Sequence, residues 1–107
     1  MFTEPSAEGY RELIPGVRLK TVAHGDRTLM GVFSIDSGAV IPEHDHPQEQ
    51  TGYLVSGRLE FLIEGSAKVA EPGAGWNLSA GTRHGARALE DCVVVEVFSP
   101  VREDYLP

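Results

Sequence analysis

Glycine and proline interrupt this chain at short intervals along its whole length. There are 12 glycines and 7 prolines among 107 residues, and the runs between them are rich in Val, Leu, Ile, Phe and Thr. No segment keeps a helical period of apolar residues over three turns. Many short β-prone runs separated by regular turns predict an all-β barrel or a double-sheet jelly roll.

The expected strands lie between these turns. Ser56-Gly57 separates two of them and is expected to form a hairpin turn, because glycine adopts positive φ without steric cost. The run from Cys92 to Phe98 is nearly all apolar, which is typical of a strand buried on both faces or lying deep in a barrel. The predicted strands cover residues 17–23, 28–35, 51–55, 59–63, 67–70, 75–78, 86–89 and 92–98.

Length, charge and cysteine content narrow the class of protein. A chain of 107 residues is expected to form one domain, residues 1–107. The formal net charge is 9 − 16 = −7 without a cluster of Lys or Arg, so nucleic acid and membranes are not expected partners. Cys92 is the only cysteine, and the first residues lack the pattern of a signal peptide. We therefore expect a cytoplasmic protein.

Three histidines carry the strongest chemical signal in the sequence. His44 and His46 are two residues apart, which puts both imidazoles on one face of an extended strand, and His84 follows on a separate segment. Such a pair alone is usually solvated on a surface. Three imidazoles with one side-chain oxygen, however, can hold one divalent transition metal (Zn, Ni, Mn or Fe) and leave coordination positions open.

Two neighbouring residues compete for the role of fourth ligand. Strand alternation puts Gln50 on the side of His44 and His46, whereas Glu49 points the other way. The turn at Pro47 could break that parity, so both assignments stay open and Gln50 is favoured. A neutral amide leaves the metal its full charge, which strengthens its pull on an anionic ligand.

Three other residues are expected to have structural roles. His24 precedes the Gly25-Asp26 turn and is expected to be solvated. Cys92 is expected in the core, and Trp76 in the core or a cavity wall, where its indole N–H needs a partner.

The spacing of the histidines resembles a known pair of motifs. A glycine, His-x-His, a polar ligand and a second glycine occur between Gly38 and Gly57, and a Gly-x-x-His turn ends at His84. This pattern resembles the two signature motifs of the cupin superfamily over about half of the chain. Gln50, Ser79 and Ala88 depart from those motifs. The resemblance implies the cupin double-stranded β-helix, a jelly-roll barrel.

The last apolar run contains one acidic residue. Glu96 shares a strand face with Phe98, opposite to Val95 and Val97. This face could point to solvent, which would make Glu96 an ordinary surface charge. Alternatively, Glu96 and Phe98 point into the barrel near the metal, and Arg102 folds over the mouth.

A narrower resemblance joins these residues. The tail from Glu96 to Tyr105, with the three histidines and Gln50, is similar to the KdgF group of cupins, which ketonise 4,5-unsaturated uronates during pectin and alginate breakdown. The resemblance implies a small anionic sugar-derived substrate and places the active-site acid, phenylalanine and arginine on Glu96, Phe98 and Arg102. The family has aspartate where this chain has Glu96. The resemblance also implies metal ligands at His44, His46, Gln50 and His84.

The resemblance also implies a separate chemical role for the metal and for each active-site residue. The metal stabilises charge on an enolate oxygen, while Glu96 moves the proton as general acid and base. Arg102, with Arg83 or Arg87, clamps the substrate carboxylate, and Phe98 excludes water.

Two other functions and an oligomeric state remain as alternatives and expectations. Three nitrogen ligands would also suit an iron-dependent dioxygenase. A non-catalytic module that senses a small carboxylate at the metal is the second alternative. Small cupins resemble one another in pairing through their sheets, so we expect a homodimer.

Overall fold

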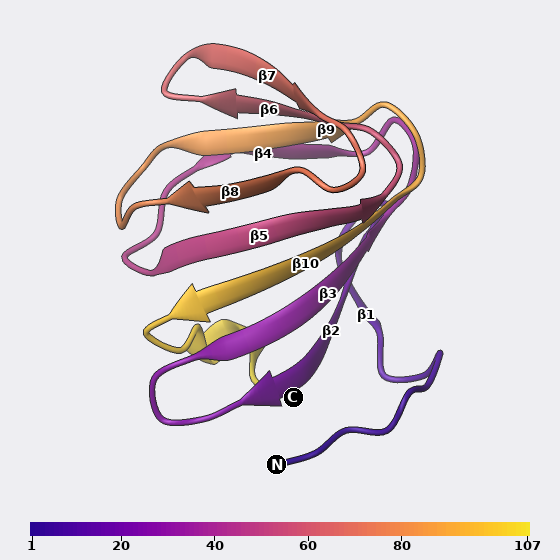
Figure 1. Cartoon of the computed structure of the whole chain (residues 1–107), viewed down its shortest axis with the longest axis vertical. Helices are drawn as coiled ribbons and strands as arrows, with labels where there is room; N and C mark the ends of the chain where they lie inside the picture. Colours follow the sequence, from indigo (N-terminus) through magenta and orange to yellow (C-terminus); the bar gives the residue numbers. More distant parts are fainter.

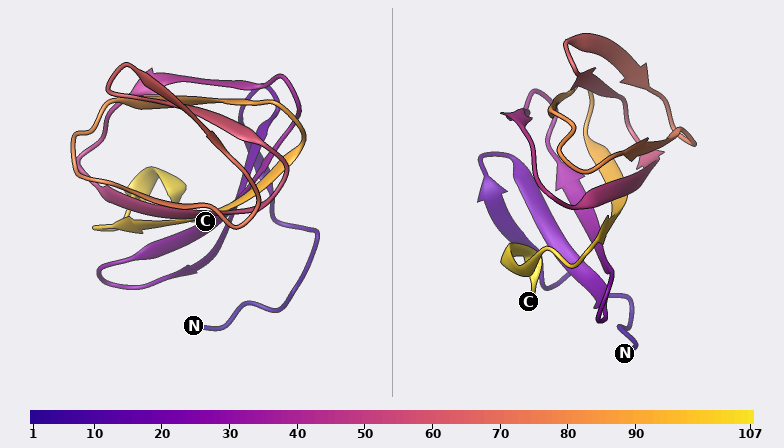
Figure 2. Two further views of the ribbon diagram at one scale, coloured as in Figure 1. Left: turned by 45° about the horizontal axis from the view of Figure 1, so that its top comes forward. Right: turned by 90° about the vertical axis from the view of Figure 1, so that its left-hand side faces the viewer.

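The computed structural model describes residues 1–107 and contains ten strands in two antiparallel sheets. The sheets face each other, and the strands surround a common interior (Figures 1 and 2). A short 3₁₀ helix, η1 (Glu103–Tyr105), follows the last strand. The predicted all-β cupin-type fold is confirmed. Its two sheets remain separate and do not close into one continuous barrel.

The larger sheet holds the last long strand near its centre. In spatial order its strands are β1 (Arg11–Ile14), β2 (Val17–His24), β3 (Leu29–Ile35), β10 (Cys92–Ser99), β5 (Glu49–Ser56) and β8 (Gly75–Leu78). The smaller sheet has the order β4 (Val40–His44), β9 (His84–Ala88), β6 (Leu59–Ile63) and β7 (Ser66–Ala70). Neighbours far apart in sequence, such as β3 and β10, are paired side by side, as in a jelly roll.

Strict alternation in β10 determines what faces the interior. Cys92, Val94, Glu96 and Phe98 are buried, whereas the residues between them are half-buried on the outer face. The run is therefore not buried equally on both faces. Its outer side is apolar as well, which made the sequence look continuously hydrophobic.

The core lies between the two sheets. Side chains from both sheets contribute to one cluster, in which Leu19, Leu29, Leu54 and Leu59 are almost fully buried. Burying each such side chain contributes about 1.5–3 kcal/mol. Cys92 belongs to this cluster and His24 is exposed, as the sequence predicted.

The sequence analysis did not predict two of the ten strands, β1 and β4. β1 is four residues long and half exposed, and it pairs only with β2. β4 contains Pro42 and has an irregular register against β9 between Ile41 and His44. Proline and a short polar pattern both weaken the signal of a strand.

Gly57 turns the chain between β5 and β6, but the predicted hairpin is wrong, because β5 belongs to the larger sheet and β6 to the smaller one, and the two strands do not pair. The φ of Gly57 is +90°, and a Cβ at this position would lie 2.2 Å from the carbonyl oxygen of Asp91 and 2.8 Å from Sγ of Cys92. The turn thus needs glycine for two reasons, its backbone conformation and its lack of a side chain. None of the helical segments is long and apolar enough to cross a membrane.

Replacing Gly57 with alanine should separate these two reasons. Gly38 has a similar φ of +85°, but a Cβ at that position would meet no atom within 4 Å, so Gly38→Ala is the matched control. We expect Gly38→Ala to cost about 1–2 kcal/mol of unfolding free energy and Gly57→Ala distinctly more. Urea denaturation of both variants measures the difference. Equal losses would contradict the steric argument.

Candidate active site

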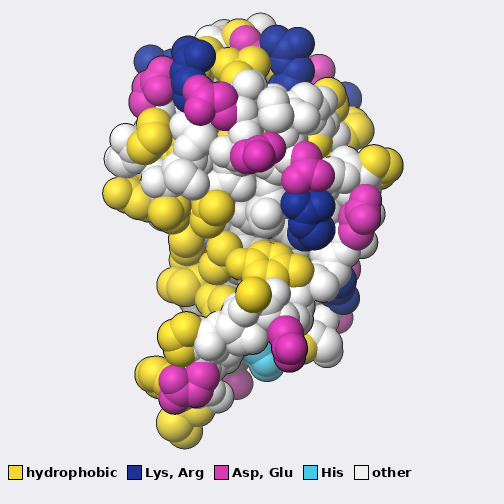
Figure 3. Space-filling view, turned by 90° about the vertical axis from the view of Figure 1, so that its right-hand side faces the viewer, with side chains coloured by type: hydrophobic (Ala, Val, Ile, Leu, Met, Phe, Trp, Pro, Cys, Tyr) yellow, Lys and Arg dark blue, Asp and Glu magenta, His cyan; other side chains and the backbone are white.

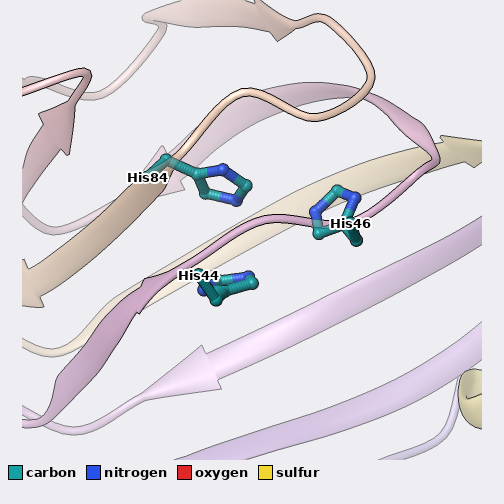
Figure 4. A group of neighbouring side chains, drawn as sticks. All are labelled: His44, His46 and His84. Carbon is teal, nitrogen blue, oxygen red and sulfur yellow. The ribbon is translucent and has the colours of Figure 1, made fainter.

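Three histidines from three places in the chain meet at one end of the interior. His44 ends β4, His46 lies in the loop that follows, and His84 begins β9, where the register pairs it directly with His44. Their rings point into a shared space (Figure 4), and one nitrogen from each lies within 4.8 Å of the others. The structure thus brings together the three imidazoles that the sequence proposed as ligands.

Backbone carbonyls fix the tautomer of each ring. Nδ1 of His44 lies 2.9 Å from the carbonyl oxygen of Pro42, Nδ1 of His46 lies 3.0 Å from that of Gln48, and Nδ1 of His84 lies 2.8 Å from that of Thr82. A carbonyl oxygen only accepts, so each Nδ1 donates. The lone pair of a neutral ring is then on Nε2, where it can ligate a metal.

Burial favours the neutral form of two of these rings. His84 and His46 are both buried, and this desolvation lowers the pKa of each imidazole below its ordinary value. The nearby Arg102 guanidinium lowers the pKa of His46 further. Neutral imidazole is the form that binds a metal.

The amide of Gln50 lies next to the three imidazoles. Oε1 of Gln50 lies 3.0 Å from Nε2 of His46, while its amide nitrogen faces the Glu96 carboxylate. With Nδ1 of His46 protonated, Oε1 and Nε2 are two acceptors aimed at each other. Donors that share one metal at about 2.1 Å also lie about 3 Å apart. This arrangement fits a divalent transition metal between them.

The competing fourth ligand points elsewhere. Glu49 is exposed on the outer face of β5 and accepts a hydrogen bond of 2.9 Å from the side-chain amide of Asn77. Gln50 is buried and lines the cavity. Alternation within β5 therefore puts Gln50 inside and Glu49 outside. His46 lies in the loop before β5, so the prediction that it shares one strand with His44 is wrong.

A cavity opens beside the histidines. Its space is about 480 Å³, part of it open to solvent, and its walls are mostly apolar. Glu96 and Phe98 point into it from β10, so the interpretation of Glu96 as a surface charge is wrong. The polar and charged residues that line it are His44, Gln50, His84, Glu96, Arg102 and Tyr105.

Burial changes the acidity of the cavity carboxyl. The side chain of Glu96 is almost fully buried, and this desolvation raises its pKa to about 7, although hydrogen bonds from Gln50 and Trp76 act in the opposite direction. A carboxyl group with such a pKa can donate or accept a proton near neutral pH. Trp76 supplies its indole N–H as the partner that the sequence argument required.

Arg102 reaches the cavity from the segment after β10. Its guanidinium carbon lies 3.9 Å from the ring centroid of Tyr105 and 5.2 Å from that of Phe98. It donates hydrogen bonds of 3.0 and 3.3 Å to the two carboxylate oxygens of Asp104. These contacts hold a mostly buried positive charge at the mouth of the cavity.

The other two arginines proposed as carboxylate clamps lie outside the cavity. Arg83 is exposed and 3.6 Å from the Glu43 carboxylate, and Arg87 forms a 3.2 Å ion pair with Glu60. Neither lines the cavity, so their predicted role as clamps is wrong. Their ion pairs hold both side chains at the surface, which leaves Arg102 as the cationic side chain of the cavity.

Comparison with protein families identifies this arrangement. A family model described as a cupin domain matches residues 31–98, more than half of the chain. This chain belongs to the cupin family. The match extends from β3 to β10 and includes all three histidines and Glu96.

Two relatives of this cupin share one name. The pectin degradation protein KdgF of Dickeya dadantii (strain 3937) is 29% identical over 99 residues, which are 91% of this chain and 90% of that protein. The structure of KdgF from Halomonas sp. is 35% identical with a TM-score of 0.93, covering 99% of this chain and 100% of that chain. The resemblance to KdgF-type cupins is confirmed.

A third cupin shares the fold at lower identity. The RmlC-like cupin from Shewanella frigidimarina NCIMB 400 is 23% identical with a TM-score of 0.92, covering 98% of this chain and 95% of that chain. At this identity the likeness shows the fold alone.

Sequence reasoning missed part of the cupin's cavity. It gave no role to Asp104 and Tyr105, which hold Arg102, although both stand in the tail that carried the KdgF resemblance. It also could not pair Trp76 with Glu96, because their contact depends on the order of β8, β5 and β10 in the sheet.

Proposed function

We propose that this cupin binds one divalent transition metal and catalyses the ketonisation of a 4,5-unsaturated uronate. The carrying observation is one cavity, lined by His44, Gln50 and His84 beside His46, that also holds a carboxyl with a pKa of about 7 and a mostly buried arginine. The similarity to KdgF of Halomonas sp. over 99% of the chain supports the same reaction class. The proposed ligands are His44, His46, Gln50 and His84.

The reaction requires proton transfer to carbon and control of negative charge. A 4,5-unsaturated uronate opens to an enol beside its carboxylate, and the enol becomes a ketone when its O–H proton leaves and a proton adds to carbon 4. A bound metal supplies Lewis-acid stabilisation of charge on a substrate oxygen. No other atoms are gained or lost, so the reaction needs no redox partner.

The chain's own residues have distinct proposed roles. Glu96 delivers the proton to carbon and can receive one from the enol, because its pKa lies near neutrality. Arg102 binds the substrate carboxylate through its guanidinium, while Phe98 and the apolar wall exclude water from the reacting atoms. The overall charge of −7 makes Arg102 important for attracting an anion.

Metal content tests the first part of this proposal. We expect the native protein to retain one divalent ion per chain after reconstitution with zinc, nickel, manganese or iron, and His84→Ala to retain much less, since it removes a buried ligand. His24→Ala, at an exposed position outside the site, is the matched control and should bind like the native protein. Elemental analysis of dialysed samples gives the content. A metal-free native protein would refute metal binding.

Turnover tests the second part. With metal-loaded protein and 4,5-unsaturated galacturonate, we expect faster loss of the vinyl proton signal in a proton NMR time course. Arg102→Ala should lower kcat/KM about 10- to 100-fold, because a charged hydrogen bond to the substrate is lost. Arg83→Ala removes an exposed arginine and should have no effect. A metal-loaded native protein without turnover would instead favour oxygen-dependent chemistry or carboxylate sensing, which oxygen uptake distinguishes.

We also propose that two copies pair through the larger sheet. Its outer face carries a patch of apolar side chains, and hydrophobic side chains gather along the left-hand side of Figure 3. We call this the outer patch; it consists of Met30, Val32, Tyr53, Val55, Val93, Val95 and Val97. Three of these, Met30, Tyr53 and Val55, are exposed, and a homodimer would cover them.

The mass in solution tests this pairing. We expect the native protein to behave as a dimer in light scattering after size exclusion. Tyr53→Lys puts a charge in the outer patch and should shift the protein toward the monomer. Val69→Lys changes an exposed residue of the smaller sheet and serves as control. A monomeric native protein would count against the proposal.

The cytoplasmic location remains a prediction from the sequence. It agrees with Cys92 as a free, buried thiol. The absence of a Lys or Arg cluster still makes nucleic acid and anionic membranes unsuitable partners.

A further inference from the structure

We propose that Trp76 is a positioning residue that fixes the Glu96 carboxylate for proton transfer. This inference rests on the proposed function of Glu96 as acid and base. Trp76 extends from β8, two strands away from Glu96 in the larger sheet, and it is absent from the cavity lining. Its contact with the cavity carboxylate means that it acts through Glu96.

The indole holds both oxygens of the carboxylate. Nε1 of Trp76 donates to Oε1 of Glu96 at 3.1 Å and lies 3.3 Å from Oε2. Glu96 is 5% exposed, so water does not compete for these oxygens. One N–H shared between both oxygens in a water-free site leaves the side chain little rotational freedom.

Glycine makes this contact possible. Gly52 on β5 pairs with Trp76 on β8 and with Glu96 on β10, so the two side chains meet across it. A Cβ at position 52 would lie 2.2 Å from Nε1 of Trp76 and 2.4 Å from Oε2 of Glu96. The hydrogen bond between Trp76 and Glu96 therefore occupies the space that a side chain at position 52 would fill.

Packing fixes the indole itself. Phe61 on β6, in the opposite sheet, meets the ring of Trp76 edge to face with 4.7 Å between ring centroids. Phe61 in the smaller sheet thereby orients the indole of Trp76, while Trp76 and its acceptor Glu96 both belong to the larger sheet. A carboxylate held in this way points its reactive oxygen in one direction, and small displacements of a catalytic group lower rates severely.

Kinetics of Trp76→Phe provide the first test. The variant keeps an aromatic ring against Phe61 and loses the N–H donor. We expect kcat to fall about tenfold or more with KM and metal content little changed. In a Glu96→Gln background the same change should have no further effect, since no acid remains to be positioned. An equal loss in both backgrounds, or none in either, would overturn the proposal.

Two further variants separate positioning from general damage. Gly52→Ala places a methyl group between the indole and the carboxylate and should lower kcat as Trp76→Phe does. Leu54→Val trims a fully buried core side chain outside the cavity. It should lose stability but keep kcat, whereas a loss of kcat in Leu54→Val would mean that destabilisation alone explains the effect.

A spectroscopic measurement tests the contact without turnover. Trp76 is the only tryptophan, so the metal-free protein has a single indole N–H signal in its proton NMR spectrum. In spectra recorded well above the pKa of Glu96, we expect this signal to move upfield in Glu96→Gln, because a charged acceptor is replaced by a neutral one, and to stay in place in Arg102→Ala. An unmoved signal in Glu96→Gln overturns the contact. Absent turnover in native protein overturns the proposed function, and the NMR result then decides the contact independently.

Discussion

The register between β4 and β9 is the constraint on which the site depends. It sets His44 directly opposite His84, and the loop after β4 adds His46 to the same place. A slip of one residue would turn either imidazole to the other face of the sheet. The hydrophobic core between the sheets resists that slip, because it would expose buried side chains of β9 such as Ala88.

The same alternation imposes an electrostatic cost on β10. It places Glu96 among apolar residues, where an isolated carboxylate is strongly disfavoured. The structure meets this cost in two ways, with directed donors from Gln50 and Trp76 and with a pKa raised to about 7. A buried acid with a near-neutral pKa beside three histidines that could hold a metal is typical of catalytic sites.

Patterns local in sequence predicted much of this protein. Short β-prone runs between glycine and proline turns predicted eight of the strands, and motif spacing predicted the cupin fold and the grouping of the three histidines. Predictions failed where the outcome depended on distant partners. Arg83 and Arg87 flank His84 in sequence, yet their pairing with Glu43 and Glu60 on the surface follows from strand positions that no local pattern contains.

The sequence by itself determined the class of fold and the chemical groups of the site, because turn residues, strand period and histidine spacing act over a few positions. Only the tertiary structure decided which groups meet. It placed Gln50 inside and Glu49 outside, brought Arg102 over the cavity from the segment before η1, and let Trp76 reach Glu96 across Gly52. These contacts join strands far apart in the chain, and they arise from sheet order and register, which are set when the whole core packs.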